Sequence, residues 1–329
     1  MRTVTIALIG CGTVTIKAHI PALMNDPSAR LSGYCFRITA VCSLEQDNMD
    51  LIRAMLPGVE TFTDYRELLV KSECEAVLIA TGEESHPQIC RAALECGKYV
   101  LCEKPLGISR AEIAQGFQDV KELAETKLQV GFNKRYYPCY LRYKDLLESG
   151  GIGRPISGSF YFITQQGRKT GWPGILSNLI HYCDLIVSIF GELQDPKVCF
   201  NVDACGTSIS VAALSIDQAV VSLFFSTAGV WQASLHEEWQ ILDGNRTRLL
   251  ARNGDQTYLF RNGSEAVFTG MSNSVFWLAD PHGYVAQLKA FYDLVCGAIP
   301  RPEVGYSDAI AAHALFDRIQ SLCSRSLEG

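Results

Sequence analysis

The sequence predicts an α/β domain followed by an α+β domain. Over the first half, short apolar runs alternate with segments of helical spacing, a pattern typical of a doubly wound parallel sheet. From Ser208 onward, shorter runs are separated by Asn-Gly and Asp-Gly pairs, which join antiparallel hairpins. The length of 329 residues fits two domains at roughly 150 residues each. We therefore expect a doubly wound domain over residues 1–133 and an open, mainly antiparallel sheet domain over 134–329.

The composition is that of an ordinary soluble globular enzyme. Hydrophobic residues make up 48% of the chain, charged residues make up 19%, and the formal net charge is -6. No basic run or basic amphipathic stripe stands out, which argues against a nucleic-acid or membrane-surface partner. A small polar molecule is the expected partner.

Cysteine usage indicates a reducing compartment. The count of 13 is odd and includes no Cys-x-x-Cys spacing, so neither a zinc site nor a disulfide framework is expected. The apolar run Thr3–Ile9 is too short to span a membrane, and it leads into a glycine turn rather than a small-residue cleavage site. We expect no metal, no signal peptide and a cytoplasmic location.

The first strand is expected at Val4–Ile9, and a glycine turn follows it. Helical spacing begins at Ile16 and continues to Met24, so the turn has the strand-turn-helix context of a dinucleotide fingerprint. The first glycine allows the tight turn, the second lets the backbone approach a pyrophosphate, and the helix start offers unpaired N–H groups to the anion. The sequence thus predicts a Rossmann domain that binds NAD or NADP. The candidate cofactor contacts in the turn are Gly10, Cys11, Gly12, Thr13 and Val14.

Two positions depart from that fingerprint. Thr15 occupies the place of the third glycine, so its methyl must tuck into a gap or push the helix outward. Ser43 stands at the tip of the second strand, Arg37–Cys42, where an acidic residue normally reads the ribose, and Glu45 follows two residues later. The choice between NAD and NADP therefore stays open. Alternatively, Ser43 merely caps the helix that begins near Gln46.

The end of a further strand and the start of the helix after it provide two more candidate cofactor contacts. Asp64 is a capping signal for the helix that starts at Tyr65, and Glu75–Thr81 is the next buried strand. A polar loop and a helix over 86–96 follow it. The carboxyl end of a parallel strand faces the ligand crevice, so Thr81 and His86 are expected near the nicotinamide or ribose.

The strand over 98–102 ends in Glu103, Lys104 and Pro105. Proline has no N–H group and cannot continue a central strand, which leaves a carboxylate and an ammonium at the sheet edge. Chemistry in open parallel sheets takes place at such ends, although a solvated Glu-Lys pair is the alternative. A long helix over Ser109–Thr126 and a sixth strand over Leu128–Asn133 are expected next.

The second half opens with a helical link over 134–149 and a strand over 156–164. Gln165–Trp172 is expected to be a substrate-side loop or, alternatively, a surface turn with Trp172 packed beneath it. In the helix expected over 174–190, Ser177, His181 and Asp184 are spaced i, i+4, i+7 and share one face. The remaining expected strands are Ser208–Ile216, Ala219–Ser226, Val230–His236 and Arg246–Ala251, and the terminal helices are Val285–Gly297 and Ser307–Cys323.

Six short motifs stand in a specific order along nearly the whole chain. They are Gly10-Cys11-Gly12 with His19 and Pro21, Thr63-Asp64-Tyr65, Ala80-Thr81 with His86, Glu103-Lys104-Pro105, Gly131-Phe132-Asn133 with Arg135, and His181-Tyr182-Cys183-Asp184. With these motifs the chain resembles the Gfo/Idh/MocA family of glucose-fructose oxidoreductases and inositol dehydrogenases. The resemblance implies a Rossmann domain, an α+β domain with an open antiparallel sheet, and a homodimer or homotetramer formed through that sheet.

The resemblance also implies roles for individual residues. The lysine matching Lys104 lies beside the reacting carbon, the glutamate matching Glu103 contacts the cofactor ribose, and His181 is expected to be catalytic. Family dehydrogenases carry an aspartate where this chain has Ser177, so His181 would transfer the proton alone, the substrate would differ from a simple polyol, or activity would be lost. The expected substrate contacts are Arg135, Trp172, Ser177, Asn178 and Asp184.

Three functions remain open. The leading hypothesis is an NAD(P)-dependent oxidoreductase that acts on a carbinol or carbonyl carbon of a sugar, cyclitol or related small polar metabolite. The second is a reductase of an imine or keto intermediate in a biosynthetic pathway, which the missing carboxylate favours. The third is a non-catalytic NAD(P)-binding regulator of the same fold.

Overall fold

The computed structural model describes residues 2–24, 34–165, 170–203, 206–229, 237–254, 256–261, 264–269 and 282–327. The chain forms two compact units, Met1–Asn133 with Ser274–Ile310 and Lys134–Asn273 with Ala311–Gly329. The first segment of the first unit ends at Asn133. The segment Ser274–Ile310, however, belongs to the first unit, whereas the sequence assigns it to a second domain over 134–329.

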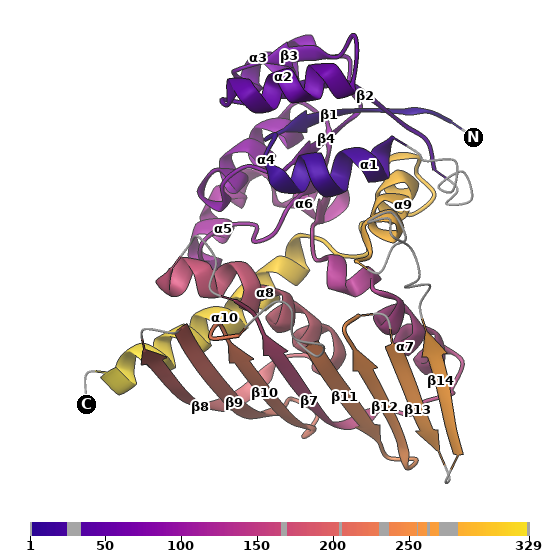
Figure 1. Cartoon of the computed structure of the whole chain (residues 1–329), viewed down its shortest axis with the longest axis vertical. Coiled ribbons are helices and arrows are strands. Elements are labelled where there is room, and N and C mark those ends of the chain that lie inside the picture. Colours follow the sequence, from indigo (N-terminus) through magenta and orange to yellow (C-terminus); the bar gives the residue numbers. More distant parts are fainter. Residues whose placement is uncertain are drawn as a thin grey trace. The chain divides into compact units, whose positions relative to one another are not determined.

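The first unit contains one parallel sheet (Figure 1). Its strands are β1 Val4–Ile9, β2 Phe36–Cys42, β3 Glu60–Phe62, β4 Ala76–Ile79, β5 Tyr99–Cys102 and β6 Leu128–Val130. The six strands lie in the order β3-β2-β1-β4-β5-β6, and all neighbouring pairs run parallel. The order reverses between β1 and β4, the switch point at which doubly wound sheets bind ligands. The predicted doubly wound sheet is confirmed.

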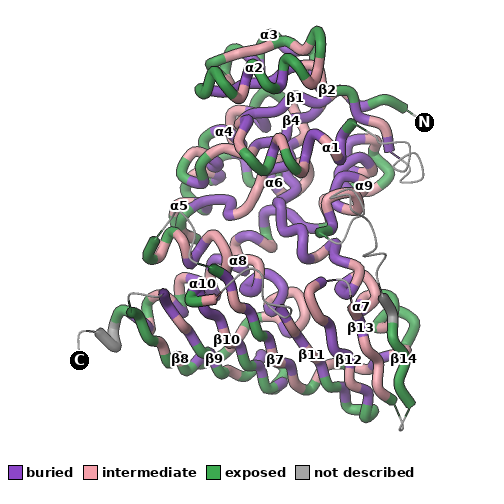
Figure 2. The backbone as a smooth tube through the Cα atoms, in the orientation of Figure 1, coloured by how far each residue is buried: buried purple, intermediate pink, exposed green. Residues whose placement is uncertain are grey.

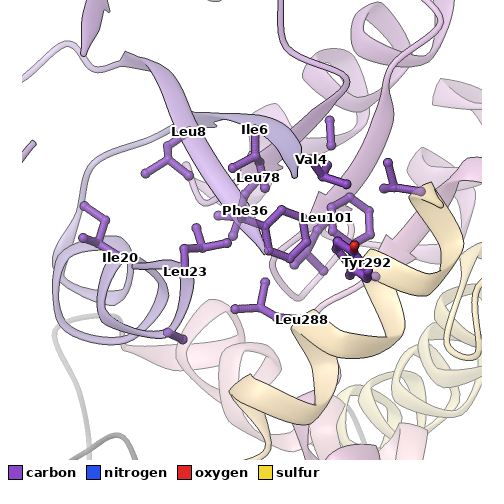
Figure 3. Close-up of a cluster of buried hydrophobic side chains, with 14 of the residues drawn as sticks. Val4, Ile6, Leu8, Ile20, Leu23, Phe36, Leu78, Leu101, Leu288 and Tyr292 are labelled. Carbon is purple, nitrogen blue, oxygen red and sulfur yellow. The ribbon is translucent and has the colours of Figure 1, made fainter. Parts of the chain in front are cut away.

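Helices cover both faces of this sheet. On one face pack α1 Ile20–Leu23, α2 Gln46–Met55 and α9 Tyr284–Val295. In Figure 3, Ile6 and Leu8 of β1 point into a cluster that Leu288 and Tyr292 of α9 complete. This apolar contact explains why a segment so late in the chain joins the first unit. The intervening residues of the central strands, such as Ala7, are also buried, as a sheet covered on both faces requires.

The other helices of the first unit are α3 Tyr65–Lys71, α4 His86–Glu95, α5 Arg110–Gly116 and α6 Lys121–Lys127. Two of them begin at a capping side chain, of which Asp64 was the predicted one. Asp64 Oδ1 accepts the N–H of Arg66 at 2.9 Å, and Ser109 Oγ accepts the N–H of Glu112 at 3.2 Å. These bonds satisfy N–H groups that a helix start leaves unpaired.

The single long helix predicted over Ser109–Thr126 is wrong. The chain forms α5, a 3-10 turn at Gln118–Val120, and then α6. A Cβ on Gly116 would lie 2.9 Å from Cβ of Pro87 on α4, so only glycine fits at this crossing. Glycine is also a weak helix former, and the helix ends there.

The second unit contains a mainly antiparallel sheet (Figure 1). Its strands are β7 Pro155–Ile163, β8 Leu193–Asp203, β9 Gly206–Ser215, β10 Val220–Ser226, β11 Glu237–Asp243, β12 Thr247–Arg252, β13 Gln256–Arg261 and β14 Ser264–Thr269. The eight strands lie in the order β14-β13-β12-β11-β7-β10-β9-β8, and only β7 and β10 pair in parallel. The predicted open, mainly antiparallel sheet is confirmed.

One face of this sheet forms the core of the second unit. Helix α7, Pro138–Glu148, contacts β12 and β13, and helix α8, Gly171–Phe190, contacts β7. Phe160 stacks on Trp239 at 6.4 Å between ring centroids, and Tyr143 of α7 meets Trp239 edge-on at 6.3 Å. Buried and exposed residues alternate along the strands in Figure 2, so the opposite face is open.

Two long helices belong wholly or partly to this unit. Helix α8 is long and apolar enough to cross a membrane by composition alone, but 56% of its most apolar window is buried, as in the core helix of a globular domain. Helix α10, Tyr306–Leu327, begins before Ile310 and continues into the second unit.

Four strands of the second unit lie outside the ranges expected from the sequence, namely β8, β11, β13 and β14. The expected strand Val230–His236 lies outside the described residues, and β11 follows directly after it. In β8 the pairing slips between Gln194 and Lys197, and Asp195 has a positive φ of 42° beside Pro196. Proline and a bulge hide the alternating pattern by which a strand is recognised.

Candidate functional site

The two glycines of the turn after β1 have different surroundings. The fold requires glycine at Gly10, whereas the space around Gly12 is open. Gly10 has a φ of +93°, and a Cβ there would lie 2.4 Å from the Ala80 carbonyl oxygen, so a side chain at Gly10 would clash with the end of β4. A Cβ on Gly12 would meet nothing within 4 Å. Thr13 and Val14 beside it are exposed. The turn therefore has open space beside its second glycine, where a dinucleotide fingerprint lets a pyrophosphate approach the backbone.

Thr15 is accommodated by a wider helical turn. Its side chain is 0% exposed, and its hydroxyl donates to the Gly10 carbonyl oxygen at 2.7 Å. The first turn, Thr15–His19, is a π-helix, and only then does α1 begin. A π turn has a larger radius than an α turn, which makes room for a side chain where the fingerprint has glycine.

Ser43 is engaged in local contacts at the tip of β2. Its backbone N–H donates to the Phe62 carbonyl at 3.1 Å, and its hydroxyl accepts the N–H of Glu45 at 3.1 Å. This is a local turn bond rather than a helix cap, because α2 has Glu45 as its N-cap residue and no capping side-chain hydrogen bond. Nearby, burial raises the pKa of the Cys11 thiol to about 12 and that of Cys42 to about 11, so both remain neutral thiols.

Glu103 is held at both carboxylate oxygens. His19 Nε2 donates to Oε1 at 2.8 Å, and the backbone N–H of Lys104 donates to Oε2 at 3.2 Å. Burial raises the pKa of Glu103, but the hydrogen bond and charge of His19 and the charge of Lys104 outweigh burial, so the pKa lies below its ordinary value. Glu103 is therefore an ionised carboxylate at neutral pH.

His86 links the ends of β4 and β5. Its Nδ1 lies 2.7 Å from the Pro105 carbonyl oxygen, and its Nε2 lies 3.1 Å from the Thr81 carbonyl oxygen. The side chain is 1% exposed, and burial lowers the pKa of His86. In this structure His86 thus contacts backbone at the strand ends, where the sequence places a cofactor contact.

Lys104 is half-buried. It lies in the chain between Glu103, which His19 contacts, and Pro105, whose carbonyl His86 contacts. The peptide bond that joins it to Pro105 is cis. The backbone before it is fixed, since the N–H of Glu103 donates to the Ile79 carbonyl at 2.8 Å. Lys104 and the glycine turn both follow carboxyl ends of parallel strands in the same sheet, and they therefore lie along one edge.

In the second unit, α8 carries two residues of the predicted polar face, Ser177 and His181, at half-buried positions, whereas Asp184 is buried. Ser177, Asn178 and His181 are half-buried on this helix, and Asn178 Nδ2 donates to the Gly174 carbonyl at 3.1 Å. Trp172 at its start packs edge-on against Phe316 of α10 at 6.0 Å between ring centroids. That contact supports the alternative in which Trp172 is a packed residue. Residues 166–169 of the expected loop lie outside the described residues.

Asp184 and Arg135 form a buried ion pair. Arg135 Nε donates to Asp184 Oδ2 at 3.0 Å, and the side chains are 12% and 1% exposed respectively. Arg135 also donates to the Tyr140 hydroxyl at 2.9 Å. Both residues were expected to contact substrate. Here they hold α7 and the 3-10 turn before it against α8.

A second buried ion pair was not foreseen from the sequence. Lys134 Nζ donates to Glu237 Oε2, and the two side chains are 8% and 4% exposed. The ammonium also lies 4.8 Å from the ring centroid of Tyr137 and 4.9 Å from that of Tyr182. The paired residues are 103 positions apart, so no local spacing could indicate their contact.

Within the described residues, no cluster of three or more His, Cys, Asp or Glu side chains has the arrangement of a metal site. The expectation of no metal therefore stays an expectation.

Comparison with known proteins identifies relatives. The model of an oxidoreductase family with an NAD-binding Rossmann fold, GFO_IDH_MocA, matches residues 4–132. Inositol 2-dehydrogenase of Salmonella typhimurium is 26% identical over 193 residues, which cover 58% of this chain and 55% of that protein. The chain thus matches about half the length of this curated relative.

Solved structures share the fold over the whole chain. A dehydrogenase from Chromobacterium violaceum superposes with a TM-score of 0.87 at 15% identity and covers 100% of this chain and 98% of its own. An oxidoreductase from Agrobacterium radiobacter, solved with NAD+, L-tartaric acid and magnesium, has a TM-score of 0.80 at 18% identity, with 98% and 97% covered. At such low identity the likeness establishes the two-sheet fold.

Proposed function

Because this chain belongs to the Gfo/Idh/MocA family of oxidoreductases, we propose that it transfers hydride between nicotinamide and a carbinol or carbonyl carbon of a sugar, cyclitol or related small polar metabolite. The observation that carries the proposal is the single sheet edge on which an open glycine turn and a half-buried lysine stand together. A pyrophosphate cradle and an ammonium on one edge suit a dinucleotide and a reacting oxygen.

In this proposal the first unit holds the cofactor. The backbone from Gly10 to Val14 binds the pyrophosphate, and Thr81 and Ser43 line its two sides. A bound NAD supplies the hydride acceptor or donor. Ser43 has no charge to repel a 2'-phosphate, so NADP stays an alternative cofactor.

Lys104 is the proposed catalytic cation. A carbinol carbon releases hydride only as its hydroxyl loses a proton, so negative charge develops on the oxygen. A partly desolvated ammonium stabilises that charge more strongly than water does. In the reverse direction the same ammonium polarises the carbonyl. Glu103 keeps a negative charge beside Lys104 and favours its protonated form.

His181 is the proposed proton carrier of the second unit. It is half-buried, and histidine exchanges protons near neutral pH. Ser177 and Asn178 beside it bind substrate hydroxyls, because both side chains donate and accept hydrogen bonds. Neither side chain transfers protons at neutral pH. Proton transfer in this chain then rests on His181 without a carboxylate at position 177.

The test measures nicotinamide absorbance at 340 nm with a panel of sugars, cyclitols and amino sugars. Lys104→Ala should lower turnover about 10²–10⁴-fold and leave the Kd for NAD within about threefold, because the ammonium acts on the reacting oxygen. Lys121→Ala, a change of an exposed lysine on α6, is the control. Normal turnover by the Lys104→Ala variant would sink the assignment.

The missing carboxylate favours two other functions. Ser177 and Asn178 suit an imine or keto intermediate, whose reduction demands less of a general base, and they also suit a dinucleotide-binding regulator. Reduction of imines but not oxidation of polyols in the same panel would select the first. Tight NAD binding without turnover of any compound would select the second.

We also propose a homodimer or homotetramer formed through the open face of the second sheet. Apolar residues are exposed there, among them Tyr161 at 37%, Leu214 at 40% and Val220 at 56%. Tyr161 and Phe224 stack on this face at 5.4 Å. Tyr161→Glu should shift the mass measured by light scattering to that of one chain, because a charge opposes burial of the face.

The described cysteines are all free thiols, in keeping with the proposed cytoplasmic location.

A further inference from the structure

The tip that carries Lys104 is contacted from two sides by buried histidines. His19, 1% exposed, reaches the Glu103 side chain from the helical turn after β1. His86, also 1% exposed, reaches the Pro105 carbonyl from the start of α4. The residues on both sides of Lys104 are therefore each bound by an imidazole, and Lys104 lies between them.

At His19 the contact uses Nε2. This nitrogen lies 2.8 Å from Glu103 Oε1, whereas Nδ1 is buried and has no hydrogen-bond partner among the described residues. The ring of Tyr284 packs at right angles to the imidazole at 5.2 Å between centroids and limits its rotation. A carboxylate only accepts hydrogen bonds, so the N–H that serves Glu103 is on Nε2.

At His86 the contact with the tip uses Nδ1. Both ring nitrogens face carbonyl oxygens, which only accept hydrogen bonds. Burial lowers the pKa of His86, so the neutral ring carries a single N–H at neutral pH. We assign this proton to Nδ1, because its distance to the Pro105 oxygen, 2.7 Å, is shorter than the 3.1 Å between Nε2 and the Thr81 oxygen.

We propose that His19, through Nε2, and His86, through Nδ1, are positioning residues that together fix the direction of the Lys104 ammonium. The inference deepens the proposed function and rests on it, since it assigns to two buried histidines the alignment of the catalytic cation. Neither histidine touches a reacting atom. Each acts through a neighbour of Lys104, one through a carboxylate and the other through a backbone carbonyl.

The test exploits the shapes of the two carboxamide side chains. The amide nitrogen of asparagine lies where histidine has Nδ1, and that of glutamine lies near the place of Nε2. His19→Gln and His86→Asn therefore keep the donor that faces the tip, whereas His19→Asn and His86→Gln remove it. Volume and polarity change by similar amounts within each pair.

The expected result is a crossed pattern. Turnover should fall about threefold or less in His19→Gln and His86→Asn, and about tenfold or more in His19→Asn and His86→Gln, because only the latter pair loses a hydrogen bond to the tip. The Kd for NAD should stay within about threefold in all four. Ile20→Val, next to His19, and Ile89→Val, in the same helix as His86, are buried changes that should leave turnover unchanged.

A second measurement separates this inference from the proposed function. Reductive methylation with ¹³C-formaldehyde labels the lysines, and the resonance absent from Lys104→Arg belongs to Lys104. Its chemical shift should move in His19→Asn and His86→Gln and stay near the wild-type value in the other two variants, even if no substrate is turned over. Glutamine better than asparagine at both sites, or effects that follow the melting temperature alone, would overturn the inference.

Discussion

Both units bury a carboxylate with a nitrogen donor beside it, but in different surroundings. In the first unit, His19 and Glu103 pair at the end of β5, directly beside the half-buried Lys104. In the second unit, Lys134 and Glu237 pair among aromatic rings, where both side chains are less than one-tenth exposed. The first pair thus lies at the carboxyl edge of a sheet beside a half-buried lysine, and the second pair is enclosed by side chains of its own unit.

The difference indicates two uses of buried charge. A charge beside a strand end affects the protonation and direction of its neighbours, and its loss should appear in binding or turnover. A charge enclosed by side chains has been removed from water at a considerable free-energy cost, which only its partner offsets. Loss of that partner should appear in stability.

The largest effect is expected for Glu237→Leu. The change leaves the Lys134 ammonium buried without its carboxylate, which should lower the free energy of unfolding by about 3–5 kcal/mol. The measurement is urea unfolding followed by tryptophan fluorescence, since Trp239 lies two residues along the same strand. Glu67→Leu, at an exposed pair with Lys71, is the control and should cost about 0.5 kcal/mol or less.

The double variant Lys134→Met with Glu237→Leu sharpens that prediction. Replacing both charges by apolar groups removes the desolvation cost together with the pair, so stability should return to within about 1 kcal/mol of wild type or exceed it. If the double variant is as unstable as Glu237→Leu, the ammonium's contacts with Tyr137 and Tyr182 are the source of the stability, and the comparison between the units fails.

The next largest effect separates two glycines of the first unit. Gly10→Ala should destabilise by about 1–3 kcal/mol, because alanine at a φ of +93° is strained and its Cβ meets the Ala80 carbonyl. Gly12→Ala should change stability by about 0.5 kcal/mol or less, since its Cβ meets nothing within 4 Å.

The affinity for NAD, unlike stability, should be strongly affected by Gly12→Ala. Gly12→Ala is folded normally but places a methyl group where the pyrophosphate approaches, so the Kd for NAD should rise about tenfold or more. Titration calorimetry gives this value without any substrate. Unchanged NAD affinity in Gly12→Ala would mean that the open space at Gly12 is not the pyrophosphate cradle.

Much of the fold followed from local patterns. β1 begins and ends at the predicted residues, and the Asp64 cap starts α3 where expected. Features decided by contacts between distant residues were wrong or missed. The break in the predicted helix at Gly116 depends on the approach of Pro87, and the place of α9 depends on apolar contacts with β1. Neither contact leaves a trace in local spacing.

The site divides in the same manner. The positions of Gly10, Gly12 and Lys104 at strand ends followed from sequence order, because a parallel sheet collects those ends on one edge. The partners of His86 and Arg135 did not. Side-chain pairing depends on which groups remain unsatisfied after the chain has folded, and the sequence contains no direct signal of that.

The pH dependence of stability should distinguish three groups with lowered pKa values. Unfolded His86 takes up a proton below about pH 6.5 while the buried ring does not, so the free energy of unfolding falls as the pH drops below that value. For Glu103, stabilisation is complete above its unfolded pKa of about 4.5 and is lost as the pH falls through the lower folded value.

In the second unit, Asp243 behaves like Glu103. Burial raises its pKa, but the N–H groups of Gly153, Thr247 and Asn245 outweigh burial and lower the pKa. His86→Asn should therefore remove the stability loss that starts near pH 6.5, and Glu103→Gln and Asp243→Asn should each remove part of the loss below about pH 4.5. Each unit of pKa depression corresponds to about 1.4 kcal/mol. A wild-type curve flat from pH 7 to pH 5 would contradict the assignment to His86.

The smallest effect is expected at Thr15, which borders the open edge of the first unit. Thr15→Val removes the hydroxyl that donates to the Gly10 carbonyl and should cost about 1 kcal/mol, because a partly buried carbonyl loses one hydrogen bond. Thr15→Ser keeps this donor and should cost less. Chemical unfolding of both variants provides the comparison. A loss in Thr15→Ser with little or none in Thr15→Val would show that the methyl group, rather than the hydroxyl, stabilises the π turn, and this turn would then belong with the packed interior rather than with the polar strand ends.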